Sequence, residues 1–181
     1  GGALVEAVDD AGPACLPHRL PRECRHVREA GDDTCDERAG GVACPGMDYC
    51  ALATARSIPI AQDIAKRFAD QNRQRLIGEL GIKISGCINA CGHHHIGNIG
   101  ILGLEKSGEE SYQITLGGDA TEHAAIGERL GPGLTADEVP DTIERIVDIY
   151  LAERQNNERF IDTYRRVGIE KFKGAIHAVD A

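Results

Sequence analysis

Alternating apolar and polar positions in the middle of the chain predict three strands. Residues 81–85, GIKIS, alternate as a half-buried strand does, because successive side chains of a strand point to opposite faces. Residues 98–104 and 111–116 are two further runs rich in β-forming side chains. Residues 105–110 between them are mostly polar, so the two runs predict a hairpin with a loop somewhat longer than the tightest type.

A helical period follows residue 51. Ile60, Ile64 and Phe68 fall at positions i, i+4 and i+8, so they share one face of the predicted helix. Pro59 either kinks this helix or restarts it. Most of the local positive charge comes from Arg56, Lys66, Arg67, Arg73 and Arg75. A solvated helix face is the plainest interpretation of these residues.

Two more helices are predicted in the C-terminal part of the chain. Their apolar positions are Val139, Ile143, Ile146 and Tyr150 in the first, and Phe160, Tyr164 and Val167 in the second. Thr135 and Glu138 have the spacing of a capping box, or else Pro140 is the first helical position. Gly168 is predicted to end the second helix.

Residues 1–40 show no apolar period, because Pro13, Pro17 and Pro21 interrupt a dense mixture of Arg, His and Cys. A zinc site is one interpretation of this segment, with Cys15, His18, Cys24 and His26 as its candidate ligands. Their spacings match no common zinc pattern, so unpaired thiols and surface histidines are preferred.

Charge and cysteine content narrow the class of protein. A net charge of −9 and a pI near 5.2 argue against nucleic acid or an anionic membrane surface as a partner. No apolar run approaches the ~20 residues that span a bilayer, and no signal peptide is visible. Seven cysteines, an odd number, point to metal ligation in a reducing, cytoplasmic compartment. Since Met47 is the sole methionine, we expect a fragment or a processed product.

Four of the cysteines form two tight pairs with Gly or Pro beside them. Cys44 and Cys50 have five residues between them, and Cys87 and Cys91 have three. These gaps fit zinc poorly, and a redox C-x-x-C, a haem-attachment C-x-x-C-H and a ferredoxin C-x2-C-x2-C are all missing. Thiolates bind iron strongly, so the two pairs indicate a soft metal centre.

The pattern C-x5-C followed by C-x3-C resembles the sirohaem and [4Fe–4S] signature of the sulfite and nitrite reductase haemoproteins. Residues 44–53, CPGMDYCALA, and 92–103, GHHHIGNIGILG, are also similar to that family. The resemblance covers roughly residues 41–176. It implies the family's α+β fold, a mixed sheet with flanking helices and a helical C-terminal tail. It implies that Cys44, Cys50, Cys87 and Cys91 bind the cluster, that Cys91 also bridges to the sirohaem iron, and that Asn89 contributes to the cofactor site.

The resemblance further implies a division of the chain and a reaction. Residues 41–130 become the cofactor-binding domain and 131–181 the helices that pack on it, after a poorly specified segment 1–40. The reaction is the reduction of sulfite to sulfide in six one-electron steps, with electrons from a flavoprotein or a ferredoxin. Sulfite is preferred to nitrite because the segments around both cysteine pairs look closer to the sulfite branch.

Other functions remain as alternatives to this one. They are nitrite reduction to ammonia, a non-catalytic iron–sulfur module that only relays electrons, and a zinc-stabilised binding domain. In the family, the basic residues that bind the anion lie in an earlier part of a much longer chain. We therefore expect the chain to act with the remainder of the haemoprotein, and its sequence assigns no catalytic residue.

Three features near the cysteines have two interpretations each. Arg56 either belongs to the solvated face or binds a sirohaem carboxylate. His93, His94 and His95 form a polar loop, or one of them supplies protons near the sirohaem edge. Gly117 and Gly118 allow close approach of a flat macrocycle, or they make a plain turn.

Overall fold

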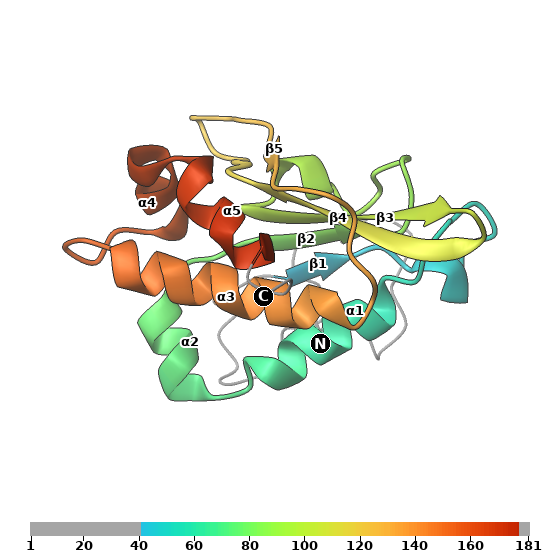
Figure 1. Ribbon diagram of the computed structural model, residues 1–181, viewed down its shortest axis with the longest axis horizontal. Helices are drawn as coiled ribbons and strands as arrows, with labels where there is room; N and C mark the ends of the chain where they lie inside the picture. The colour runs from blue at the N-terminus through green and yellow to red at the C-terminus, as the bar shows by residue number, and fades with distance from the viewer. Residues whose placement is uncertain (1–40, 178–181) are drawn as a thin grey trace, which may run out of the picture.

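A five-stranded mixed sheet organises the computed structural model, which describes residues 41–177 (Figure 1). The strands follow chain order across the sheet: β1 (Gly41–Ala43), β2 (Ile82–Ser85), β3 (Ile99–Lys106), β4 (Glu109–Leu116) and β5 (Glu128–Arg129). The first three pair in parallel and the last three antiparallel. This confirms the α+β class and its mixed sheet. The two interpretations of Cys15, His18, Cys24 and His26, as a zinc site or as unpaired thiols and surface histidines, concern positions outside the described residues.

The hairpin between β3 and β4 is tighter than predicted. Lys106 pairs with Glu109, so only Ser107 and Gly108 remain in the turn, where the sequence suggested a longer loop. Both turn residues have positive φ, 58° and 85°. Two left-handed residues are what a type I′ turn requires, and its twist matches that of the strands. The polar residues on either side, including Glu105 and Glu110, therefore continue the strands.

The first helical segment begins later than predicted. Residues 51–57 form turns, and α1 (Ile58–Arg67) starts with Pro59 in its first turn, so the proline marks the start of the helix. Ile60 and Ile64 are buried, and Phe68 packs at the edge of the core, which confirms the predicted apolar face. A short helix, α2 (Gln71–Ile77), follows; the side chain of Asp70 caps it.

The C-terminal part contains three helices: α3 (Glu138–Glu153), α4 (Phe160–Val167) and α5 (Ile169–His177). The predicted apolar stripes are confirmed: Val139, Ile143, Ile146, Tyr150 and Phe160 are fully buried, Tyr164 is buried, and Val167 packs against the core. Gly168 ends α4 with a φ of 77°, as predicted, but α5 resumes at once. The division of the chain at residue 130 stays a prediction.

The start of α3 shows the Thr135–Glu138 contact of the first predicted cap and contradicts the second. The Glu138 carboxylate accepts hydrogen bonds from the Thr135 N–H at 2.7 Å and the Thr135 hydroxyl at 2.9 Å. This is the returning half of a capping box. Pro140 lies within the first turn and is not the first helical residue. The hydrogen bond from the Thr135 N–H is the main reason that the pKa of Glu138 is lowered.

Helices α1 and α3 contact each other and cover one face of the sheet (Figure 1). Strand residues that alternate along β3 and β4, such as Ile99, Ile101, Ile114 and Leu116, are buried against these helices. On the opposite face lies the short 3₁₀ helix η4 (His94–Ile96), which contacts β2 and β3. No helix within residues 41–177 is long and apolar enough to cross a membrane.

Gly117 and Gly118 pack against this chain's own atoms. A Cβ on Gly117, which has a φ of 86°, would lie 2.1 Å from the Tyr164 ring. One on Gly118 would lie 2.4 Å from the Gly97 carbonyl oxygen. The close approach that the two glycines permit is therefore to α4 and to the end of η4, which favours the interpretation as a structural turn.

Ion pairs hold α1 and α2 against α3. Glu144 of α3 accepts from Arg73 at 2.6 Å and from Arg67 at 2.8 Å, and Arg67 also contacts Asp141. The hydrogen bond from Arg73, followed by that from Arg67, lowers the pKa of Glu144. Two of the basic residues that we assigned to a solvated face thus connect helices.

Replacing this carboxylate tests the network. Glu144→Gln should lower the free energy of unfolding by about 0.5–1 kcal/mol at neutral pH, since the pairs are only partly shielded from water. The lowered pKa means that the stabilisation is present above the ordinary pKa of 4.5 and is lost as the pH falls through the folded-state value. Urea unfolding of parent and variant should therefore converge in acid, below the folded-state pKa of Glu144.

The matched control for this experiment is Glu170→Gln. Glu170 pairs with Lys173 on the same helix and is largely exposed. An equal loss of stability in both variants, or a difference that persists in acid, would contradict a specific role for Glu144.

Candidate metal centre

Both cysteine pairs follow parallel neighbouring strands. Cys44 comes directly after β1, and Cys87 follows β2 with one residue between. Ala43 pairs with Ile84, and the Cys44 N–H donates to the Ile84 carbonyl at 3.0 Å. Because the carboxyl ends of parallel strands meet at one edge of a sheet, both pairs emerge at the same edge.

The first cysteine loop folds back onto the start of the second. A 3₁₀ turn, η3 (Gly46–Asp48), leads to Cys50, whose N–H donates to the Gly46 carbonyl at 2.9 Å. The chain then returns, and the N–H groups of Thr54 and Ala55 donate to the Gly86 carbonyl at 2.9 and 3.0 Å. The first loop thereby encloses the residue that precedes Cys87.

The contact between the two loops is backbone against backbone. A Cβ on Gly86 would lie 2.7 Å from the Ala55 carbonyl oxygen and 2.8 Å from the Gly46 Cα. Neither neighbour is the end of a flexible side chain, so a larger residue requires the loops to separate. Gly46 itself has a φ of 60°, which glycine adopts without strain.

The second cysteine loop is a compact series of turns over the end of the sheet. The Ala90 N–H donates to the Cys87 carbonyl at 3.2 Å, and Ala90 has a φ of 56°. The Gly92 N–H donates to the buried Ser85 hydroxyl at 3.2 Å. A Cβ on Gly92 would lie 1.9 Å from the Ile84 carbonyl oxygen, so glycine is required where the loop crosses β2.

The four thiols differ in their surroundings. Cys44 and Cys87 are buried, Cys50 is half-buried and Cys91 is exposed; all four are free. The Gly86 N–H donates to the Cys44 sulfur at 3.0 Å. Backbone N–H groups directed at sulfur are one of the features that set the potential of iron–sulfur clusters.

This donor set fits a cluster better than a single ion. Among residues 41–177, no three His, Cys, Asp or Glu side chains converge on the position of one metal ion. A cube of four irons takes one thiolate per iron and is much larger than an ion, so its ligands lie further apart. Two cysteine loops that meet at Gly86 supply thiolates, the donor type that such a cluster takes.

Arg56 is held by carboxylates of this chain. Its guanidinium lies 2.8 Å from Glu110 and 3.5 Å from Asp48. Its backbone N–H also donates to the Glu110 carboxylate at 2.8 Å. Burial would raise the pKa of Glu110, but the hydrogen bonds from the Arg56 N–H and the Tyr112 hydroxyl lower it. These pairs favour a structural role for Arg56 over the binding of a sirohaem carboxylate.

The three histidines are not equivalent. His94 is buried, and its Nδ1 has no hydrogen-bond partner within the described part of the chain, while its ring contacts that of His95 edge-on. Burial, followed by the charge of His95, lowers the pKa of His94 from its ordinary value of 6.5. His94 is therefore neutral at pH 7, which makes it a poor proton source in this state.

The chain matches the family model described as the nitrite and sulphite reductase 4Fe-4S domain over residues 36–179. It belongs to this family. The predicted family is confirmed, and the 4Fe-4S domain that the match describes carries the predicted type of cluster. The ligand assignments to Cys44, Cys50, Cys87 and Cys91, and the contribution of Asn89, remain predictions.

Named relatives of this 4Fe-4S domain include reductases of both anions. Sulfite reductase (ferredoxin) 2 of Mycolicibacterium paratuberculosis is 33% identical over 129 residues, which are 66% of this chain and 23% of the relative. The assimilatory ferredoxin-dependent nitrite reductase of Haloferax mediterranei is 31% identical over 132 residues, 67% of this chain and 22% of the relative. The chain thus spans about a quarter of the length of these relatives.

Solved structures share the fold of this 4Fe-4S domain. The Mycobacterium tuberculosis NirA protein superposes with a TM-score of 0.62 at 27% identity, over 75% of this chain and 27% of that one. Dissimilatory sulfite reductase I superposes with a TM-score of 0.66 over 75% of this chain and 51% of that one. At 16% identity, the second likeness shows the fold alone.

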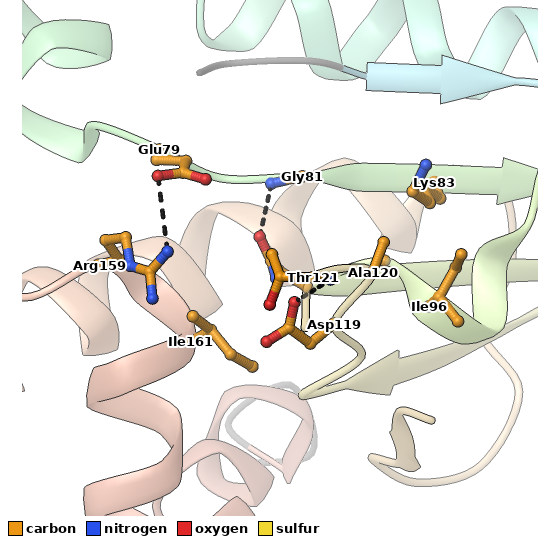
Figure 2. A pocket seen from close by; sticks show the side chains of 11 residues that line it. Glu79, Gly81, Lys83, Ile96, Asp119, Ala120, Thr121, Arg159 and Ile161 are labelled. Atoms are coloured by element: carbon orange, nitrogen blue, oxygen red, sulfur yellow. Dashed lines mark hydrogen bonds and ion pairs between the residues drawn. The ribbon is translucent and has the colours of Figure 1, made fainter. Parts of the chain in front are cut away.

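A cavity of about 180 Å³ lies apart from the cysteines, at the amino end of β2 (Figure 2). Three of its four charged residues have partners within the protein: Arg159 lies 3.9 Å from Glu79, and the Asp119 carboxylate accepts the Thr121 N–H at 2.8 Å. Asp119 also binds Arg165 at 2.8 Å and is almost fully buried. Since these polar groups are satisfied within the protein, we assign the cavity no chemistry.

The contact between the cysteine loops predicts the effect of one substitution. Gly86→Ala should lower the free energy of unfolding by about 1–3 kcal/mol, because the added methyl group meets backbone atoms on two sides. Denaturant unfolding without cluster measures this loss. The cluster-loaded variant should also contain less iron per chain than the parent, since the loops move apart.

Gly174→Ala in α5 is the control, because a Cβ there has nothing within 4 Å. Alanine in a helix should be neutral or slightly stabilising relative to glycine. A Gly86→Ala protein with the stability and iron content of the parent would show that the loops do not depend on this contact.

Proposed function

We propose that the chain is the cluster- and sirohaem-binding portion of a sulfite reductase, which reduces sulfite to sulfide. The observation that carries this proposal is the meeting of two cysteine loops at Gly86, with the Gly86 N–H 3.0 Å from the Cys44 sulfur. In this proposal the cluster ligands are Cys44, Cys50, Cys87 and Cys91. The exposed Cys91 also bridges to sirohaem, and Asn89 lies beside it in the same loop.

When bound, the coupled cluster and sirohaem supply single electrons and an iron with an open position for the anion. The chain's own residues hold the ligands and keep water from two of them, since Cys44 and Cys87 are buried. The loops are pre-organised by hydrogen bonds to the Gly86 carbonyl. Rigid support of this kind holds ligands in place before a cofactor binds.

Within residues 41–177, the arginine that adjoins the first cysteine loop does not offer a site for the anion. Arg56, the arginine next to the first cysteine loop, is bound to Glu110 and Asp48. Sulfite and nitrite are anions that call for Arg or Lys contacts. We therefore propose that residues in the remainder of the haemoprotein bind the substrate, and that a ferredoxin or a flavoprotein in the cytoplasm delivers the electrons.

The ligand assignment predicts the behaviour of single cysteine variants. Cys87→Ser should reduce cluster iron and acid-labile sulfide per chain severely, because a thiolate ligand is lost. Iron and sulfide analysis together with the visible spectrum measures this, and sirohaem adds chlorin-type bands to the spectrum. A cluster without those bands would favour the electron-relay alternative, and a colourless zinc protein would contradict the proposal.

The choice of sulfite predicts a difference in substrate. Full-length protein with its cofactors, reduced by a viologen dye, should form sulfide from sulfite faster than ammonia from nitrite. Nitrite reductase is the second candidate, favoured by the Haloferax mediterranei relative at 31% identity. Ammonia formation without any sulfide from sulfite would establish that candidate in place of the first.

A further inference from the structure

Ser57 occupies the position that caps α1 but does not cap it. No hydrogen bond joins its hydroxyl to the first N–H groups of the helix. Serine at this position usually accepts such a bond, which is worth about 1 kcal/mol. Here the side chain is turned toward the first cysteine: its hydroxyl donates to the Cys44 carbonyl oxygen, and its oxygen lies 3.7 Å from the Cys44 sulfur.

The surroundings confine the hydroxyl to these two partners. Ser57 is completely buried, and a Cβ on Gly46 would lie 2.5 Å from its oxygen. Gly46 has a φ of 60°, so the backbone conformation as well as the lack of space favours glycine at this position. The sequence alone does not single out Ser57, since a serine before a helical segment indicates only a cap.

We infer that Ser57 is a positioning residue for the cluster, whose hydroxyl donates to the Cys44 sulfur once that sulfur binds iron. The inference rests on the proposed assignment of Cys44 as a ligand. A free thiol can donate its own hydrogen to the Ser57 oxygen, but an iron-bound thiolate has none and only accepts. Rotation of the single O–H from the Cys44 carbonyl to the sulfur satisfies this new acceptor.

The hydroxyl then acts together with the Gly86 N–H, which already donates to the same sulfur at 3.0 Å. Two donors on one sulfur stabilise the additional negative charge of the reduced cluster more than that of the oxidised cluster. Ser57 should therefore raise the reduction potential of the cluster and slow its loss.

The test is an EPR-monitored redox titration of the cluster in the full-length, cofactor-loaded protein. Ser57→Ala should move the midpoint potential to more negative values, while Ser57→Thr, which keeps a hydroxyl, should stay close to the parent. Loss of a hydrogen bond to a metal ligand typically lowers metal affinity by about 10- to 100-fold. Iron should therefore also pass to a chelator more readily from Ser57→Ala.

Two further variants separate a hydroxyl effect from a packing effect. Ser57→Val has the shape of Ser57→Thr without its O–H, so the potentials of these two should differ. Thr163→Ala removes another completely buried hydroxyl, one that donates to Glu158 in place of a cysteine, and should leave the potential unchanged.

The outcomes distinguish this inference from the function on which it rests. Equal potentials for the Thr and Val variants, or for Ser57→Ala and the parent at full iron content, would overturn the role of Ser57 and leave the ligand assignment standing. A parent protein that binds no iron and sulfide would overturn the proposed function itself.

Discussion

The backbone of Gly86 is the constraint on which the site depends. Its carbonyl accepts the N–H groups of Thr54 and Ala55, and its N–H donates to the Cys44 sulfur. Both polar atoms of one residue on the second cysteine loop are thus bound by the first loop, the carbonyl by two backbone N–H groups and the N–H by a cysteine sulfur. The two backbone hydrogen bonds do not vary with rotamers, so they hold the loops together independently of side-chain conformation. The parallel pairing of β1 with β2 brings the loops together, and Gly86 joins them.

Charge within the described residues serves the fold. Arg67 and Arg73 join α1 and α2 to α3 through Glu144, and Arg165 binds the buried Asp119. Arg56, although it adjoins the first cysteine loop, is bound by two carboxylates. Moving one of these arginines to an anionic ligand would leave carboxylates without their partners, which is costly where they are partly buried. On the proposed function, the cations that bind the anion therefore lie outside these ion pairs, and the chain spans about a quarter of the length of its relatives.

Much of this fold and part of its site followed from the sequence. The apolar period located the buried faces of α1, α3 and α4, because packing against a single core imposes that period. The start of α1 was misplaced, since residues 51–57 contain helix-forming Ala and Leu, but the N–H groups of Thr54 and Ala55 donate to the Gly86 carbonyl. Local propensity does not register such a tertiary contact. The hairpin turn was judged too long, because charged residues around Ser107 and Gly108 resemble a loop. Ser57 gave only a capping signal, since its true partner is thirteen positions away.

Large apolar side chains are exposed in and beside the two cysteine loops. Met47, Tyr49, Leu52 and Ile88 are exposed by 46%, 62%, 73% and 78%, and all lie in or beside the two cysteine loops. Large apolar side chains that are exposed around one site favour contact with another surface, because that contact removes apolar area from water. Cys91, the ligand proposed to bridge to sirohaem, is exposed on these same loops. On the proposed function, Cys44 and Cys87 would hold the cluster where water is excluded, while Cys50 and Cys91 would hold it at a more exposed place. The remainder of the haemoprotein and its sirohaem would then cover the exposed ligands.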